Sequence, residues 1–145
     1  MVVMRIVVVE GTPSLREALV RLFAERGIEV VGTAAGHLEG LREVERARPD
    51  VVVIDVSLPP DHTDEGLGTA RAIRSRHPAV GLLVLSSRAE AGYVHRLVGL
   101  NPPGSAGYVL KERLGEPDDL VATLRRVHAG EIVIDPHIRW AGGPP

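Results

Sequence analysis

Short apolar segments alternate with longer amphipathic segments along the whole chain. Four of the apolar segments are rich in Val, Ile and Leu and do not alternate with polar residues, which is typical of strands covered on both faces of a parallel sheet. They are residues 6–9, 51–54, 82–85 and 108–110. A weaker segment, residues 29–31, follows the first one, so the pattern predicts five strands.

The segments between the strands carry apolar residues at spacings of three and four, which predicts an amphipathic helix after each strand. The first helix is expected to begin after Thr12, with Pro13 at its first position, and to end at Gly27. The second and third helices should end before Pro49 and Pro78. The apolar residues that mark the five helices are, in chain order, Leu15, Leu19, Leu22 and Phe23; Leu38, Leu41 and Val44; Leu67, Ala70 and Ile73; Val94, Leu97 and Val98; and Leu120, Leu124 and Val127.

Strand followed by helix, five times over, predicts an α/β fold with a doubly wound parallel sheet, because short links require right-handed crossovers. The expected sheet has five strands in the flavodoxin-like order 2-1-3-4-5 and is flanked by five helices. We assign residues 1–130 to this single domain and residues 131–145 to a C-terminal extension or the start of a linker. From residue 132 the extension should hold one short extended piece, and residues 142–145 read Gly-Gly-Pro-Pro.

Composition narrows the range of functions. With 145 residues, of which 44% are hydrophobic, the chain suits one globular domain with a substantial core. It has no cysteine, which excludes disulfides, thiolate metal sites and cysteine nucleophiles. The net charge of -2 argues against direct nucleic-acid binding. No apolar run reaches membrane-spanning length and no signal-peptide pattern is present, so we expect no membrane contact and a cytoplasmic location.

Four chemically useful side chains follow the predicted strands. Open parallel sheets bind ligands at the carboxyl ends of their strands, where the strand order reverses. Strands 1, 3, 4 and 5 end at Glu10, Asp55, Ser86 and Lys111, so two carboxylates, a hydroxyl and an ammonium group should lie close together. Lys111 is the single lysine among the 17 Lys and Arg residues, which makes a specific role for its compact charge more plausible.

These groups suit the transfer of a phosphoryl group to a carboxylate. Asp55 is placed as the nucleophile that would form an aspartyl-phosphate. Lys111 can pair with phosphoryl oxygens, and Ser86 can donate a hydrogen bond to one of them. A magnesium ion held by carboxylates can bridge the acceptor and the phosphoryl group.

Three segments resemble the receiver domains (CheY-like) of bacterial two-component response regulators. Residues 51–59 resemble the phosphoacceptor strand and loop, residues 84–87 the segment with the switch hydroxyl, and residues 107–111 the aromatic-plus-lysine segment. The similarity extends over residues 4–136 and is closest to receivers that precede a LuxR/NarL-type DNA-binding domain. Residues 59–67 resemble a longer loop found in some of these receivers, and residues 129–136 resemble the segment that follows their fifth helix.

The resemblance implies roles for individual residues and partners. Asp55 would be the phosphoacceptor, assisted by Lys111 and Ser86, and Ser86 with Tyr108 would form the switch. A sensor histidine kinase would supply the phosphoryl group. The response would be altered homodimerisation or altered control of a transcriptional output domain, and DNA contact would occur only through such a domain, which is absent from this chain.

The sequence departs from the receiver pattern after its first strand, where two adjacent acids are usual. Here Glu10 is followed by Gly11, which has no side-chain oxygen to offer a hard cation. The expected magnesium ligands are Glu10, Asp55 and the Ser57 backbone carbonyl, so magnesium binding should be weakened and phosphorylation slowed. Three loop acids are substitutes only if the loop folds inward: Asp61, Asp64 and Glu65.

Three functions remain open. The leading hypothesis is a phosphorylated signalling switch that is not a conventional enzyme. The second is a phosphorylation-independent pseudo-receiver that serves as an interaction or dimerisation module, which Gly11 supports. The third is a flavodoxin-type flavin binder, which an aromatic content of 3% disfavours. Simpler interpretations exist for several residues: Glu10 is a structural acid paired with Lys111, and Tyr108 is a half-buried strand aromatic. The six histidines lack metal-ligand spacing and are interpreted as surface or capping residues.

Overall fold

The computed structural model describes residues 3–141 of the chain. The predicted linker start at residues 142–145 therefore lies outside the described residues. The strands are β1 (Arg5–Val9), β2 (Glu29–Ala34), β3 (Val51–Asp55), β4 (Gly81–Ser86), β5 (Ala106–Leu110) and β6 (Ile132–Ile134). The helices are α1 (Pro13–Glu25), α2 (His37–Ala47), α3 (Glu65–Arg76), α4 (Ala91–Val98), the short 3-10 helix η1 (Lys111–Gly115) and α5 (Pro117–His128).

All neighbouring strands are parallel, and the sheet order is β2-β1-β3-β4-β5-β6. The predicted order 2-1-3-4-5 and the five flanking helices are confirmed. The sheet also has a sixth strand, which the sequence reading placed in the extension after residue 130. β6 pairs with β5 from Ala106↔Ile132 to Tyr108↔Ile134, so it supplies hydrogen-bond partners to a strand that would otherwise be an exposed edge.

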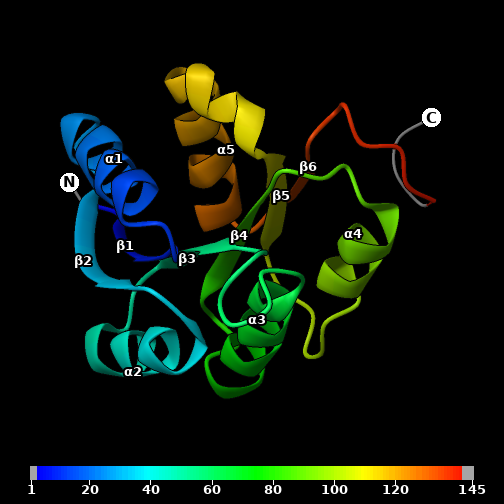
Figure 1. Cartoon of the computed structure of the whole chain (residues 1–145), viewed down its shortest axis with the longest axis horizontal. Helices are drawn as coiled ribbons and strands as arrows, with labels where there is room; N and C mark the ends of the chain where they lie inside the picture. The colour runs from blue at the N-terminus through cyan, green and yellow to red at the C-terminus, as the bar shows by residue number, and fades with distance from the viewer. Residues whose placement is uncertain (1–2, 142–145) are drawn as a thin grey trace.

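The sheet separates two apolar layers (Figure 1). On one face, α1 and α5 pack against it through buried residues such as Leu19, Phe23 and Leu124. On the other face, α2, α3 and α4 pack through residues such as Val44 and Ile73. Because both faces are covered, β1, β3, β4 and β5 are apolar along almost their whole length, as the sequence pattern predicted. Within residues 3–141 no helix has the length and hydropathy of a membrane span.

The helix boundaries follow local sequence signals. Thr12 is the N-cap residue of α1 in extended conformation, with Pro13 as the first helical residue, as predicted. After α1, Gly27 adopts a φ of 74°, a left-handed conformation that glycine tolerates without steric cost. The turn allows the Ile28 N–H to donate to the Phe23 carbonyl oxygen and leads directly into β2.

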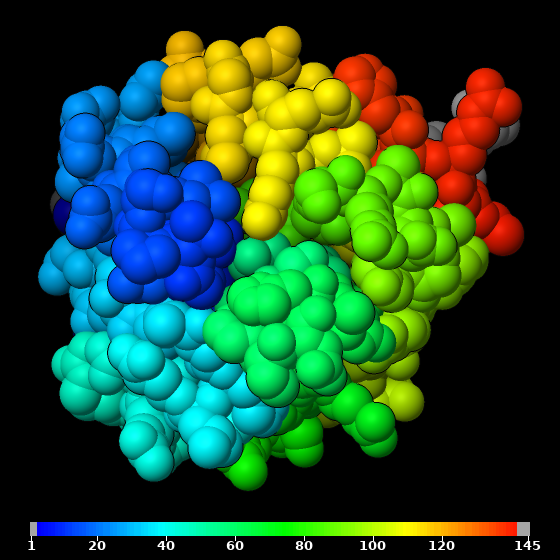
Figure 2. Space-filling model, viewed as in Figure 1, coloured from blue at the N-terminus to red at the C-terminus, as the bar shows by residue number. Residues whose placement is uncertain are grey.

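The carboxyl ends of the strands meet at one edge of the sheet. In the space-filling view the segments that follow β1 (blue), β3 (teal) and β5 (yellow) converge near the centre of one face (Figure 2). Glu10, Asp55, Ser86 and Lys111 lie in or directly after the ends of β1, β3, β4 and β5, respectively. The parallel topology therefore brings together residues that are up to a hundred positions apart in the sequence.

The close approach of α3 to the end of β3 depends on Gly66. Its N–H donates to the Val56 carbonyl oxygen at 2.8 Å, and a Cβ atom at this position would overlap the Asp55 carbonyl oxygen and lie 2.7 Å from the Val56 Cα. A glycine is therefore required for α3 to start directly behind Asp55.

We expect Gly66→Ala to lower the free energy of unfolding by about 1–3 kcal/mol, because the backbone must shift to remove the overlap. The matched control is Gly68→Ala in the same helix, where a Cβ meets no atom within 4 Å. That variant should stabilise the protein by about 0.5–1 kcal/mol through helix propensity. Urea denaturation of both variants checks this, and equal effects would show that the Gly66 contact is not restrictive.

Candidate functional site

Asp55 and Lys111 form the centre of the site. The Lys111 Nζ lies 3.1 Å from the Asp55 Oδ1, and the Ser57 N–H donates to the same oxygen at 3.1 Å. Asp55 is 4% exposed, whereas the Lys111 side chain keeps 25% of its surface exposed. The carboxylate is thus held at the edge of the sheet by one charge and one backbone amide.

Glu10 lies beside this pair and is almost completely buried. The Thr12 N–H donates to its Oε2 at 3.0 Å, and the Lys111 Nζ is 3.7 Å from its Oε1, which has no hydrogen-bond partner within residues 3–141. Burial raises the pKa of Glu10 above its usual value and the charge of Asp55 adds to the effect, against the Thr12 N–H and Lys111. Lys111 therefore contacts both acids, but its shorter contact is with Asp55.

Ser86 and Tyr108 share one backbone partner. The Ser86 hydroxyl donates to the Arg88 carbonyl oxygen at 3.2 Å and accepts from the Arg88 N–H at 3.0 Å. The Tyr108 hydroxyl donates to the same carbonyl oxygen at 3.0 Å. Tyr108 is fully buried, not half-buried, and its side chain belongs to the apolar core. Both hydroxyls are therefore bound to the loop that follows β4. Sequence reasoning did not identify the Arg88 peptide that joins the two hydroxyls.

The position after Glu10 is closed by a proline. A Cβ added to Gly11 would lie 3.0 Å from the Pro59 Cδ and 3.4 Å from the Ala35 carbonyl oxygen. The loop after β3 therefore packs against the backbone at the point where a second acid would project. This side of the site therefore lacks a second carboxylate, and Pro59 limits the space in which one could be placed.

A histidine lies on the carbonyl that was expected to bind a metal. The His62 Nδ1 is 3.2 Å from the Ser57 carbonyl oxygen, so the ring N–H donates to it. His62 itself adopts a φ of 56°, in the left-handed region. His62 is exposed, as expected for a surface or capping residue, but nothing in the sequence indicated its contact with the Ser57 carbonyl oxygen.

Two of the three loop acids, Asp64 and Glu65, are engaged in contacts within the loop or with α4. The Asp64 Oδ2 pairs with the Arg96 NH1 at 2.6 Å, and Glu65 accepts hydrogen bonds from the N–H groups of Asp61 and Thr63. The structure therefore does not support Asp64 or Glu65 as a replacement for the missing ligand. No group of three or more His, Asp or Glu side chains among residues 3–141 is arranged to hold a metal ion.

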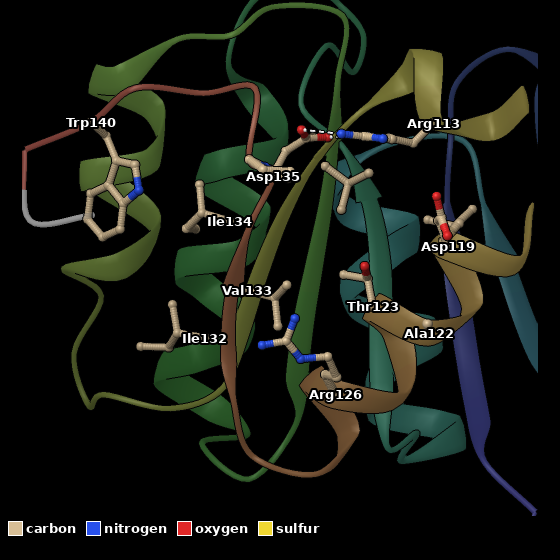
Figure 3. A pocket seen from close by; sticks show the side chains of 13 residues that line it. Arg113, Asp119, Ala122, Thr123, Arg126, Ile132, Val133, Ile134, Asp135 and Trp140 are labelled. Atoms are coloured by element: carbon tan, nitrogen blue, oxygen red, sulfur yellow. Dashed lines mark hydrogen bonds and ion pairs between the residues drawn. The ribbon is translucent and has the colours of Figure 1, made fainter. Parts of the chain in front are cut away.

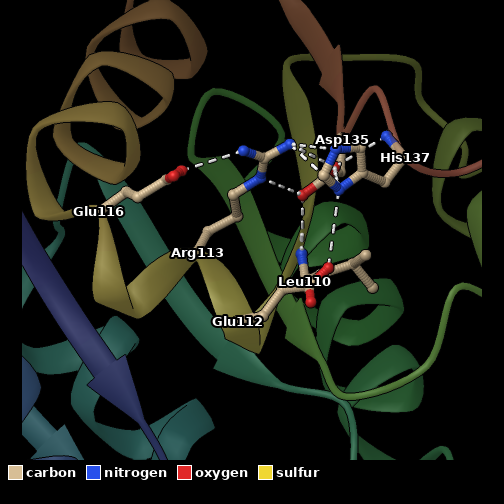
Figure 4. Close-up of polar contacts among 6 residues, drawn as sticks. All are labelled: Leu110, Glu112, Arg113, Glu116, Asp135 and His137. Carbon is tan, nitrogen blue, oxygen red and sulfur yellow. Dashed lines mark hydrogen bonds and ion pairs between the residues drawn. The ribbon is translucent and has the colours of Figure 1, made fainter.

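Asp135 and Arg113 form a second polar cluster (Figure 4), and Arg113 lies two residues after Lys111 in the 3-10 helix η1. The Asp135 carboxylate accepts hydrogen bonds from the Arg113 Nε at 3.1 Å and NH2 at 3.2 Å, and from the Leu110 N–H at 3.2 Å. The sequence reading missed this cluster, although residues 132–135 repeat the arrangement of an apolar strand followed by Asp that marks Asp55.

Burial opposes the ionisation of Asp135, but the hydrogen bonds from Arg113 and from the His137 and Leu110 N–H groups outweigh it. They hold the pKa of Asp135 below its ordinary value of 3.8. The folded state therefore binds the Asp135 proton less readily than the unfolded chain does.

Comparisons with known proteins agree with the geometry of the site. Residues 6–125 match the family model described as "Response regulator receiver domain". The chain is 34% identical over 140 residues to the uncharacterized transcriptional regulatory protein YhcZ of Bacillus subtilis, covering 93% of this chain and 61% of that protein. It is 33% identical over 110 residues to the oxygen regulatory protein NreC of Staphylococcus carnosus, covering 75% and 47% respectively.

Solved structures show the same similarity. A LuxR-family two-component response regulator from Aurantimonas sp. SI85-9A1 has a TM-score of 0.82 and 29% identity, with 94% of this chain and 93% of that chain covered. A LuxR-family DNA-binding response regulator from Staphylococcus aureus has a TM-score of 0.74 and 27% identity, with 87% and 99% covered. The chain belongs to the response regulator receiver domain family. It spans only 61% and 47% of the two relatives named above, and the match favours a receiver over the flavodoxin-type alternative.

The lowered pKa of Asp135 predicts a specific pH dependence of stability. A depressed pKa contributes stability that is complete above the unfolded value and is lost as pH falls through the folded value. The difference in unfolding free energy between the wild type and Asp135→Asn should therefore be constant above about pH 5 and shrink at lower pH. Urea denaturation across this range measures it.

Asp118→Asn is the matched control for this experiment, because the Asp118 side chain is 92% exposed and pairs with Arg26 on the surface. Its effect on stability should be small at every pH. A difference for Asp135→Asn that stays unchanged down to pH 3 would contradict the expected ionisation.

Proposed function

We propose that the chain is a phosphorelay receiver that accepts a phosphoryl group on Asp55 and thereby controls dimerisation or a transcriptional output. The observation that carries the proposal is the Lys111–Asp55 contact of 3.1 Å at the carboxyl edge of the sheet. The family match and the names of the relatives, which include transcriptional regulatory proteins, support it.

The phosphoryl donor that we propose is the phosphohistidine of a sensor histidine kinase. An Asp55 oxygen attacks the phosphorus, and an oxygen–phosphorus bond forms as the nitrogen–phosphorus bond breaks. The leaving histidine nitrogen keeps the electron pair and takes up a proton. The Lys111 ammonium reduces the repulsion between the carboxylate and the incoming anion and pairs with a phosphoryl oxygen in the product.

Magnesium is the cofactor that this chemistry implies, and the residues present offer it a reduced set of ligands. Glu10 and Asp55 provide carboxylates, and the Glu10 Oε1, which has no hydrogen-bond partner among residues 3–141, suits a cation. The Ser57 carbonyl oxygen is the third candidate, although His62 already donates to it. When bound, the ion would offset negative charge on the phosphoryl group. Two carboxylates and a shared carbonyl support weak binding.

Ser86 is the proposed switch residue. To bind a phosphoryl oxygen, its hydroxyl must give up the hydrogen bond to the Arg88 carbonyl oxygen, which Tyr108 also uses. The loop after β4 would then rearrange, and the change would reach the surface formed by α4, β5 and α5. The proposed readout is homodimerisation or contact with an output region that this chain does not span. DNA would be contacted only through that region.

Phosphoryl donors of this kind are made from ATP, so the proposal places the protein in the cytoplasm. The domain would hold one phosphoryl group per chain as a signal, and it would not turn over a substrate as a conventional enzyme does.

Mass spectrometry of the intact protein after incubation with acetyl phosphate and magnesium tests the proposal. We expect the wild type to gain one phosphoryl group, Asp55→Asn to gain none, and Asp61→Asn, which changes an exposed loop acid, to behave like the wild type. An unlabelled wild type at high magnesium would contradict the proposal and favour an interaction module. Labelling of Asp55→Asn would show that the acceptor lies elsewhere.

We expect the phosphorylation rate to depend on a lysine at position 111 and not on positive charge alone. Lys111→Arg keeps the charge but replaces a compact ammonium by a bulkier planar group, so the phosphorylation rate should fall by about tenfold or more. Phos-tag gels follow the rate. A rate equal to that of the wild type would show that any positive charge is sufficient at this position.

The contact between Gly11 and Pro59 leads to a prediction about magnesium affinity. The double variant Gly11→Asp, Pro59→Ala should bind magnesium about tenfold more tightly than the wild type, because it adds a ligand and removes the Pro59 contact. Gly11→Asp alone should gain less, and Pro59→Ala alone should gain nothing. Calorimetric titration checks these affinities. Equal gains in the single and double variants would show that Pro59 does not restrict the site.

A further inference from the structure

Residues 131–141 form a strap that crosses the β5 edge of the sheet. We call these residues the C-terminal strap. β6 pairs with β5, and the Asp135 N–H donates to the Tyr108 carbonyl oxygen at 2.9 Å. Further along, Ile138 is buried in the layer that contains α4, and the Trp140 ring lies 5.5 Å from the His95 ring of α4. The strap thus runs along β5 from its first residue and reaches α4.

The C-terminal strap packs only partly against α5. A cavity of about 550 Å³ lies between β6 and α5, with Val133 and Thr123 among the residues that line it (Figure 3). Ile132, at the start of β6, is 49% exposed. Because the apolar contact is partial, the position of the strap depends strongly on its backbone pairing with β5 and on the polar contacts of Asp135.

The Asp135 carboxylate is the buried polar anchor of the strap. Its side chain is 1% exposed, and it accepts four hydrogen bonds, two from Arg113 and one each from the Leu110 and His137 N–H groups. Arg113 donates in addition to the Glu116 Oε2 at 3.0 Å. A buried carboxylate with this many donors is ionised and fixed in orientation, and loss of its charge would leave a guanidinium without its main partner.

Two of these contacts lie on either side of Lys111. Leu110 directly precedes the lysine, and Arg113 belongs to the 3-10 helix η1, which starts at Lys111 itself. One carboxylate therefore holds the peptide before Lys111 and the turn after it. The direction in which the Lys111 side chain leaves the backbone, and hence its 3.1 Å contact with Asp55, depends on both anchored points.

Leu110, Lys111 and Arg113 lie within the part of the chain that the family match covers, but Asp135 follows its end at residue 125. We propose that Asp135 is a positioning residue for Lys111, so that the C-terminal strap is a functional part of the phosphoacceptor site. The inference rests on the proposed function for its effect on rate, but the positioning itself is measurable without phosphorylation. Displacement of the strap would loosen Lys111 and slow phosphoryl acceptance.

The first experiment measures the phosphorylation rate with acetyl phosphate for the full chain. Asp135→Asn should lower the rate constant about tenfold, because a charged hydrogen-bond acceptor is lost next to Lys111. Glu131→Gln is the matched control, since it weakens an exposed ion pair between the strap and Arg126 of α5 and leaves the Asp135 contacts in place. It should change the rate by less than about twofold.

A double-mutant cycle separates positioning from a merely structural role. In a Lys111→Met background, the further change Asp135→Asn should alter the rate by less than about twofold, because the group that it positions is gone. The same tenfold loss in that background would overturn the proposal. If Asp135→Asn does not fold, Arg113→Gln replaces it in the cycle, with the same expectation.

The second experiment reads the lysine directly. Lys111 is the only lysine in the chain, so protein made with isotope-labelled lysine gives one lysine side-chain signal by NMR. Asp135→Asn should shift and broaden that signal, and Glu131→Gln should leave it unchanged. A signal unaffected by Asp135→Asn would refute the positioning role. A shifted signal in a protein whose wild type is not phosphorylated would support the positioning role and refute only the proposed function.

Discussion

The ion pair between Lys111 and Asp55 is the interaction on which the site depends. A carboxylate that is 4% exposed is costly to ionise unless a positive charge and hydrogen-bond donors compensate for the lost hydration. Lys111 and the Ser57 N–H supply this compensation at 3.1 Å each. Glu10 adds a second buried carboxylate beside a single ammonium group, which leaves an excess of negative charge at the sheet edge. That excess is the physical reason why a cation is expected to bind during phosphoryl transfer.

Backbone proximity sets the shape of the site around this pair. Gly66 allows α3 to begin directly behind the Asp55 carbonyl, and Gly11 lies against Pro59 in the loop after β3. The first contact brings the helix to the acceptor, whereas the second closes the space that an additional acid would need. Glycine therefore has opposite consequences at the two positions: one builds the acceptor site and the other reduces its capacity to bind a metal ion.

Much of the fold and the centre of the site could be predicted from the sequence. Uninterrupted apolar strands at residues 51–54 and 82–85 have one common explanation, a parallel sheet covered on both faces, and the topology then places Asp55 and Lys111 together. Asp135 could not be assigned in this way, because a three-residue strand gives almost no periodic signal and its partner Arg113 lies 22 positions earlier. The contact of His62 with Ser57 depends on a left-handed residue in an irregular loop, which no pattern of apolar positions encodes.

The central claim is that the acceptor, the switch residues and the C-terminal strap respond as one unit. Amide NMR spectra of the wild type with and without magnesium and beryllofluoride, a mimic of the phosphoryl group, test it most directly. We expect shifts at Asp55, Ser86 and Tyr108 that continue through Leu110 and Arg113 to Asp135 in the strap. Shifts confined to the loops around Asp55, with the signals of residues 132–138 unchanged, would contradict the claim.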